Sequence, residues 1–224
     1  MGESADTSGN IIVRSDDKFC VAGYSGAGKT LLMKYFLDNV VSNFPNLIVI
    51  DPVSKFSEKV NIRYKGVVKA LKPRPNQVVY KIQTEEDMEK ILTKVNDLDN
   101  ESAFVICDEI DQFIPFNHMF TETSLFFQQG RNYNHGGMFT VRQMGRLNKQ
   151  IFSNSHYLIL FRVYNRNDID YLTTVIPYKF VKLIPELSEH SFYLIDLHTS
   201  RIIGEYELDL TKDKLKRVEG NIEP

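Results

Sequence analysis

The chain has 224 residues, of which 42% are hydrophobic, and its formal net charge is −2. This length and apolar content suit one sizeable domain, and the near-neutral charge excludes a basic field spread over the whole chain. No apolar run approaches the roughly 18 residues that cross a membrane, and the polar start MGESADTSGN is unlike a secretory signal. We therefore expect a soluble intracellular protein with no membrane partner.

Apolar runs typical of buried strands alternate with segments that favour helix. A helix is expected from the end of the GKT sequence to about Asn43, and another over residues 84–97, where Thr84 caps an acidic first turn. This alternation indicates an α/β fold with a mostly parallel sheet and helices on both faces. The expected strands are Phe19–Ala22, Leu47–Ile50, Val78–Ile82, Ala103–Cys107, Met138–Val141 and His156–Val163.

Two cysteines, Cys20 and Cys107, lie inside expected strands. Their apolar surroundings indicate small buried side chains and not a disulfide framework or a metal site.

The C-terminal part departs from the alternation of strands and helices. Phe192–Leu197 and Arg201–Tyr206 flank a polar turn, which predicts a β-hairpin over about residues 191–208 at the edge of the sheet. We expect residues 1–210 to form a single domain, with a core over about residues 11–185. Residues 211–224 are expected to be a charged, mobile tail.

The segment GYSGAGKT, directly after the first expected strand, matches the phosphate-binding pattern G-x-x-x-x-G-K-[ST]. Its glycines leave backbone N–H groups bare so that a polyphosphate can approach closely. Lys29 is expected to reach the β- and γ-phosphates of ATP, and the Thr30 hydroxyl to bind Mg²⁺. The residues predicted to bind nucleotide here are Gly23, Tyr24, Ser25, Gly26, Ala27, Gly28, Lys29, Thr30 and Leu31.

Two carboxylates end the strand in FVICDEID, at the edge of an open sheet where ligands bind. Asp108 is predicted to hold Mg²⁺ through water and so to complete the nucleotide site. Glu109 is predicted to polarise the attacking water. This division favours an ATPase over a GTPase, because Asn148–Ile151 lacks the aspartate of the guanine-reading pattern N-K-x-D.

Polar residues also follow the strand Met138–Val141. Gln143 is a candidate sensor that contacts the γ-phosphate or the water. Gln129–Gly137 is expected to be a polar, glycine-rich loop. An arginine on or near it is expected to reach the nucleotide of a neighbouring subunit. Arg131, Arg142 and Arg146 compete for that catalytic role, with a slight preference for Arg131.

The motifs occur in the order GYSGAGKT, LIVIDP, FVICDEID, QQGRNYNHGG and FTVRQMG. Over about residues 18–175 this order resembles the FtsK–HerA superfamily of DNA-pumping ATPases. It is most similar to the genome-packaging ATPases of viruses with double-jelly-roll capsids, such as the turreted icosahedral viruses of Sulfolobus. The membrane-anchoring and DNA-reading domains of cellular FtsK relatives are not expected here, so chromosome segregation is not expected either.

The resemblance implies an ASCE-type, RecA-like core with ATP and Mg²⁺ as ligands. It assigns Lys29 and Thr30 to phosphate and Mg²⁺, Asp108 to Mg²⁺, Glu109 to water activation and Gln143 to the γ-phosphate. It also implies a ring of five or six identical subunits, double-stranded DNA in the channel, contact with capsid vertex proteins, and a place in the virion or host cytoplasm. The expected function is ATP-driven movement of viral DNA into a preformed capsid. A capsid assembly scaffold without motor activity and a translocase of other cargo remain alternatives.

The sequence leaves two possible roles for each of two further segments. Seven basic residues and one acidic residue between Lys55 and Arg74 give a local charge of +6, which suits contacts to a DNA backbone or a solvated edge. The basic residues are Lys55, Lys59, Arg63, Lys65, Lys69, Lys72 and Arg74. The segment Phe113–Phe120 is expected to pack in the core or between subunits.

Overall fold

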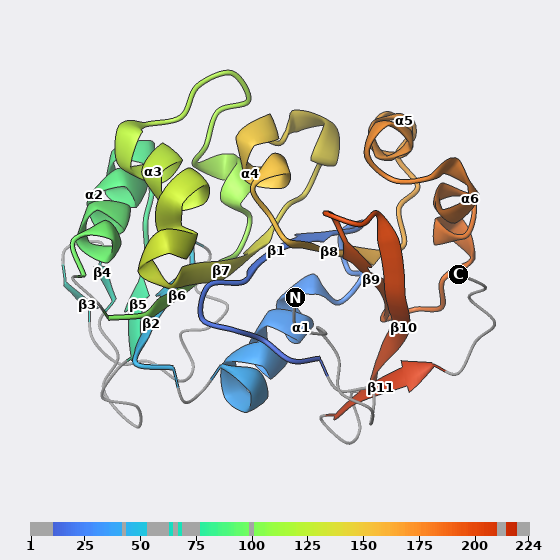
Figure 1. Ribbon diagram of the computed structural model, residues 1–224, viewed down its shortest axis with the longest axis horizontal. Helices are drawn as coiled ribbons and strands as arrows, with labels where there is room; N and C mark the ends of the chain where they lie inside the picture. The colour runs from blue at the N-terminus through green and yellow to red at the C-terminus, as the bar shows by residue number, and fades with distance from the viewer. Residues whose placement is uncertain are drawn as a thin grey trace.

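The computed structural model describes residues 11–41, 44–52, 63–64, 67–68, 77–98, 101–209 and 214–218. Within these ranges a nine-stranded sheet crosses the molecule in the order β11-β10-β9-β8-β1-β7-β6-β2-β5 (Figure 1). Its strands are β1 (Lys18–Ala22), β2 (Asn46–Ile50), β5 (Gln77–Tyr80), β6 (Ala103–Cys107), β7 (His135–Thr140), β8 (Tyr157–Phe161), β9 (Ser191–Asp196), β10 (Arg201–Asp209) and β11 (Lys214–Val218). The short strands β3 (Arg63–Tyr64) and β4 (Val67–Val68) pair separately.

Adjacent strands from β8 to β5 all pair in parallel, whereas β9, β10 and β11 continue the sheet antiparallel. The predicted α/β sheet with a C-terminal hairpin is confirmed. The hairpin strands β9 and β10 fall close to the predicted bounds.

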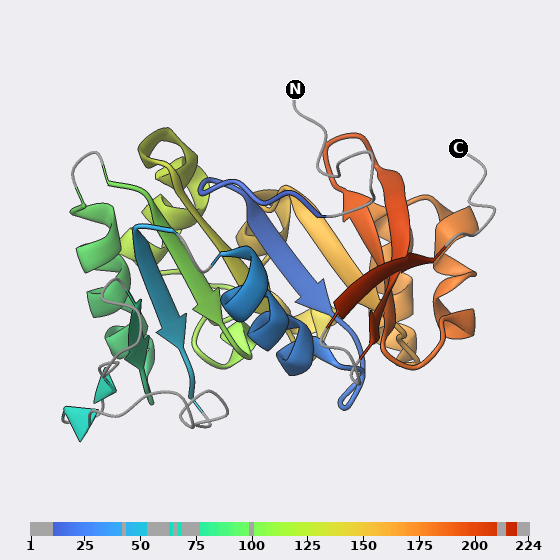
Figure 2. The same ribbon diagram turned by 90° about the horizontal axis from the view of Figure 1, so that it is seen from below.

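Helices cover both faces of the sheet unequally (Figures 1 and 2). On one face lies α1 (Lys29–Tyr35), which continues into a π-helical turn at Phe36–Val40. On the other face lie α2 (Glu85–Asn96), α3 (Thr121–Gln129), α4 (Lys149–Ser153), α5 (Arg166–Val175) and α6 (Tyr178–Val181). Thr84 accepts a hydrogen bond from the Asp87 amide and caps α2, as predicted. None of the helices in the described ranges has the length and apolarity needed to cross a bilayer.

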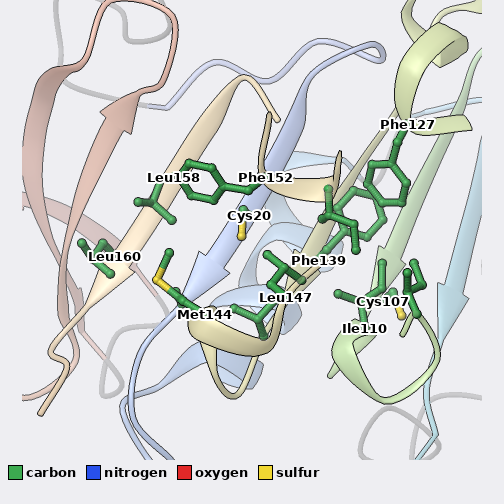
Figure 3. Close-up of a cluster of buried hydrophobic side chains, with 14 of the residues drawn as sticks. Cys20, Cys107, Ile110, Phe127, Phe139, Met144, Leu147, Phe152, Leu158 and Leu160 are labelled. Atoms are coloured by element: carbon green, nitrogen blue, oxygen red, sulfur yellow. The ribbon is translucent and has the colours of Figure 1, made fainter. Parts of the chain in front are cut away.

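The strand sequences explain why both faces need cover. In β1, Cys20 and Ala22 point into the core beneath the five-helix face, whereas Phe19 and Val21 point into the core beneath α1. Alternate residues of a strand face opposite sides, so a continuous apolar run requires packing on both. Figure 3 shows the first of these cores, where Cys20 lies among Phe139, Leu147 and Leu158.

Two sequence expectations are corrected by the structure. Gln129–Gly137 is not one long loop, because Gly130–Tyr133 forms a 3₁₀ turn and β7 begins at His135. A Cβ on Gly136 would lie 2.4 Å from the carbonyl oxygens of Ser15 and Asp17. This glycine therefore permits close backbone approach and does not mark flexibility.

The second correction concerns the tail. Residues 214–218 form β11, which pairs with β10 from Glu205 to Asp209. A charged segment can form an edge strand because one of its faces meets water. Within Phe113–Phe120, Phe113 and Ile114 are buried as core, and Phe116 is exposed. The basic run Lys55–Arg74 lies outside the residues whose side chains are described.

Both cysteines are free and fully buried, as predicted, and burial raises the pKa of the Cys20 thiol to about 12. Because the reactive species is the thiolate, we expect the folded protein to resist a disulfide reagent at pH 8. Protein unfolded in urea should react at both thiols. Rapid labelling of even one thiol in the folded protein would contradict the buried placement of these strands.

Candidate functional site

The carboxyl ends of β1, β6, β7 and β8 meet at one edge of the parallel sheet. Each strand is followed there by a polar segment. These are Gly23–Thr30 after β1, Asp108–Gln112 after β6, Val141–Gln143 after β7 and Arg162–Asn165 after β8. Chain segments that are far apart in sequence therefore form a single site, at the edge where open α/β sheets bind ligands.

The phosphate loop is fastened to the end of β8. The Tyr24 amide donates to the Arg162 carbonyl at 3.0 Å. A Cβ on Gly23 would lie 2.6 Å from the Cβ of Phe161, so the approach of the two segments requires glycine. Gly23, Gly26 and Gly28 all have positive φ angles. Such backbone turns N–H groups inward, as a phosphate cradle requires.

Lys29 is almost fully buried at the first residue of α1. Its Nζ donates to the carbonyl oxygens of Gly23 at 2.7 Å and Tyr24 at 3.0 Å. These bonds hold the ammonium group across the concave side of the loop. A point charge in that position suits phosphate oxygens, and the role of Lys29 in phosphate binding stays a prediction.

Asp108 is 1% exposed and links three segments. Its Oδ2 accepts from the Thr30 hydroxyl at 3.2 Å, and its Oδ1 accepts from the Thr140 hydroxyl at 2.6 Å. Thr140 also accepts from the Glu109 amide at 2.8 Å. The Thr30 hydroxyl and the Asp108 carboxylate are hard oxygen donors side by side, which fits Mg²⁺ held partly by water and phosphate.

Glu109 follows Asp108 but is directed differently, because its backbone is left-handed at φ 57° and ψ 49°. Its Oε2 accepts from Arg142 Nη2 at 2.5 Å and also from the Gln112 side-chain amide. The hydrogen bond to Glu109 raises the pKa of Arg142. The two adjacent carboxylates therefore have different partners, as their predicted roles require.

These segments line a cavity of about 700 Å³, within the size range of small-molecule sites. The cavity wall includes Lys29, Thr30, Asp108, Glu109 and Gln143. The predicted phosphate, metal, water-activating and sensor residues are thus brought together. Gln143 lies on the wall, so its sensor role stays a prediction.

The three candidate arginines occupy different places. Arg142 lines the cavity and pairs with Glu109 of its own subunit. Arg146 is exposed and lines an adjoining cavity of about 390 Å³, which Gln143 also lines. Arg131 lies before β7, at the opposite edge of the sheet, with its Nε 3.3 Å from Asp16. The cavity therefore brings together only one of the three with the phosphate loop.

The sequence analysis did not predict some residues that lie at the site. Thr140 and Gln112 bond to Asp108 and Glu109, and Tyr164, Asn165 and Asp168 line the cavity. Thr140 carries a usable signal, because it is a polar residue at the carboxyl end of a buried strand. The residues after β8 carry no such signal, because their place at the site follows only from the pairing of β8 with β1.

Solved structures share this fold. The genome packaging NTPase of Sulfolobus turreted icosahedral virus 2, in complex with ATP-γ-S, superposes with a TM-score of 0.71 at 15% identity. The match covers 85% of this chain and 96% of that chain. The DNA-packaging ATPase of Sulfolobus turreted icosahedral virus gives a TM-score of 0.71 at 16% identity, over 85% of this chain and 97% of that chain.

A third match is EccC of Thermomonospora curvata, ATPases 2 and 3, in complex with a signal sequence peptide. Its TM-score is 0.54 at 12% identity, over 83% of this chain and 35% of that chain. The chain shares its fold with these solved ATPase structures. No protein-family model matches this chain, and no curated protein sequence matches it either.

Replacing the two carboxylates one at a time should separate their roles. Glu109→Gln keeps the shape but loses basicity, so ATP hydrolysis should fall roughly 10²–10⁴-fold while Mg²⁺-dependent ATP binding persists. Asp108→Asn should instead raise the Mg²⁺ concentration needed for half-maximal ATP binding. Metal titrations of both variants, with Glu86→Gln on the exposed face of α2 as a matched control, measure the difference. Identical titrations for Glu109→Gln and Asp108→Asn would contradict the division of roles.

Proposed function

We propose that this chain is an ATP-hydrolysing motor that moves double-stranded viral DNA into a preformed capsid. The observation that carries the proposal is the single cavity lined by the phosphate loop, Asp108, Glu109 and Gln143. The proposal is also supported by the fold that this chain shares with two viral packaging ATPases, which extends over nearly the whole length of both.

Each residue then has a stated task. Lys29 and the backbone of the phosphate loop hold the β- and γ-phosphates of ATP. Thr30 and Asp108 would hold Mg²⁺, which when bound neutralises charge that develops on the phosphates. Glu109 accepts the proton of the attacking water, and Gln143 contacts the γ-phosphate or that water. Glu109 must release Arg142 before its carboxylate can accept a hydrogen bond from the attacking water.

DNA is assigned to the basic run Lys55–Arg74, which lies outside the residues with described side chains. Its local charge of +6 in a chain of net charge −2 suits backbone phosphates. The proposed assembly is a homo-oligomeric ring of five or six subunits with double-stranded DNA in its central channel. Capsid vertex proteins are the proposed docking partners.

The rival with a specific observation behind it is a translocase of protein cargo. EccC shares the fold, and its structure holds a signal sequence peptide. DNA separates the two proposals, because a protein translocase has no reason to turn over faster when DNA is added.

The direct test measures ATP hydrolysis with and without linear double-stranded DNA. We expect DNA to raise the turnover of the wild-type protein several-fold. Lys29→Ala loses the charge-assisted phosphate contact and should show no hydrolysis in either condition while remaining folded by circular dichroism. Turnover by wild-type protein that ignores DNA would favour the rival. Full activity of a folded Lys29→Ala protein would remove the phosphate-loop assignment.

A second test asks whether neighbouring subunits share the site. Arg131 is 59% exposed and lies at the sheet edge opposite its own phosphate loop, which suits a residue acting on a neighbour. We expect Arg131→Ala and Lys29→Ala subunits to be inactive alone and to regain activity when mixed. Each mixed ring then holds some sites with an intact lysine and an intact arginine. One arginine supplied this way accelerates related NTPases by about 10³–10⁵-fold.

Arg142→Ala is the matched control, because Arg142 contacts Glu109 of its own subunit. The effect of this substitution stays within its own subunit, so mixing it with Lys29→Ala should add no activity beyond that of the two proteins measured separately. Rescue by Arg142→Ala but not by Arg131→Ala would reverse the assignment of the two arginines.

A further inference from the structure

The cavity wall also includes two aromatic side chains, one on the phosphate loop and one on the segment that follows β8. Tyr164, which follows β8, is 56% exposed and lies on the cavity wall with Tyr24 and Val163. The ring centroids of Tyr24 and Tyr164 are 5.4 Å apart, and the rings are tilted by 52°. None of the roles assigned above to the phosphate loop, the carboxylates or the arginines uses these two rings.

The sheet order indicates on which side of the phosphate loop each part of a nucleotide would lie. Strand β1, which leads into the phosphate loop, lies between β7 and β8. Asp108, Glu109 and Gln143 all follow β6 or β7, so the reacting γ-phosphate belongs on that side of the loop. The rest of a nucleotide must then extend toward the other side, where β8 ends at Phe161 and Tyr164 follows.

Tyr164 is held in place from its own strand end. Arg162 Nη1 donates to the Tyr164 hydroxyl at 2.7 Å, and the guanidinium carbon lies 5.8 Å from the ring centroid. The Arg162 carbonyl accepts from the Tyr24 amide, which ties both tyrosines to the same residue. A fixed aromatic ring at a cavity wall presents a stacking surface at low entropic cost.

We propose that Tyr164, with Tyr24 beside it, forms the subsite for the purine base of the nucleotide. The inference rests on the proposed ATPase function and assigns the base-binding end of that site. Stacking on an aromatic ring accepts any base face, so affinity here depends little on the groups at the base edge.

Two polar side chains on the same cavity wall, Asn165 and Asp168, already accept hydrogen bonds from the protein backbone. Reading guanine requires an acceptor for its ring and exocyclic N–H groups. The Asp168 carboxylate is 6% exposed and accepts from the Gly145 amide at 3.0 Å. The Asn165 side-chain oxygen accepts from the Asn167 amide at 3.0 Å. Because stacking does not distinguish the two bases, we expect ATP and GTP to bind with similar affinity.

The test compares two probes in the presence of Mg²⁺, the β,γ-methylene analogue of ATP and inorganic tripolyphosphate, by titration calorimetry. Tyr164→Ala should weaken binding of the ATP analogue by about 5- to 150-fold and leave tripolyphosphate binding unchanged. Tyr164→Phe keeps the ring but loses the hydrogen bond from Arg162, so it should bind tripolyphosphate like the wild type and weaken binding of the ATP analogue less than Tyr164→Ala does. Tyr178→Ala is the matched control, because Tyr178 is 60% exposed, lies 4.8 Å from the Lys182 ammonium and does not line the cavity.

Each other outcome overturns the inference in a distinguishable way. If the wild type binds tripolyphosphate as tightly as the ATP analogue, or if Tyr164→Ala binds the analogue normally, the base lies elsewhere and the ATPase proposal stands. If Tyr164→Ala weakens both probes equally, the ring supports the loop and does not contact the base. If the wild type binds neither probe, the proposed function fails together with the subsite.

Discussion

The hydroxyl of Thr140 joins the ends of β6 and β7 and so determines the geometry of the site. It donates to the Asp108 carboxylate and accepts from the Glu109 amide, and Asp108 in turn accepts from Thr30 on the phosphate loop. A buried carboxylate is costly unless hydrogen bonds satisfy it, and these hydroxyls supply them. Three strands that meet only in the folded sheet therefore fix one carboxylate beside the phosphate loop and turn the next one away from it.

The sequence predicts the parts of this fold that rest on local patterns. Continuous apolar runs such as Ala103–Cys107 form strands because both of their faces are buried, and the phosphate loop follows from the spacing of Gly23, Lys29 and Thr30. The direction of the sheet edge then places Asp108 and Gln143 near the loop without further information.

The remaining features depend on partners that no local pattern names. The glycines of β7 resemble a loop in the sequence, but Gly136 is required by the backbone of Ser15 and Asp17, far away along the chain. Strand β11 exists because β10 offers it an edge. Gln112, Tyr164 and the placement of the arginines depend likewise on strand order, so the sequence left three arginines as candidates, with only a slight preference for Arg131. The structure separates them by giving Arg142 an acceptor in its own subunit and Arg131 an exposed position at the opposite edge.

The antiparallel extension gives β8 a role beyond closing the parallel sheet. Because β9 pairs along its whole length, β8 is an inner strand, and the segment that carries Tyr164 begins from fixed backbone. The turn before β9 also contacts the phosphate loop, where His190 Nδ1 lies 3.4 Å from the Ala27 carbonyl oxygen and 3.0 Å from the place of a Cβ on Gly28. The Leu208 amide of β10 bonds to the His190 carbonyl. The extension thus supports both the loop for phosphates and the strand end proposed for the base, so the two ends of a bound nucleotide would rest on one continuous sheet.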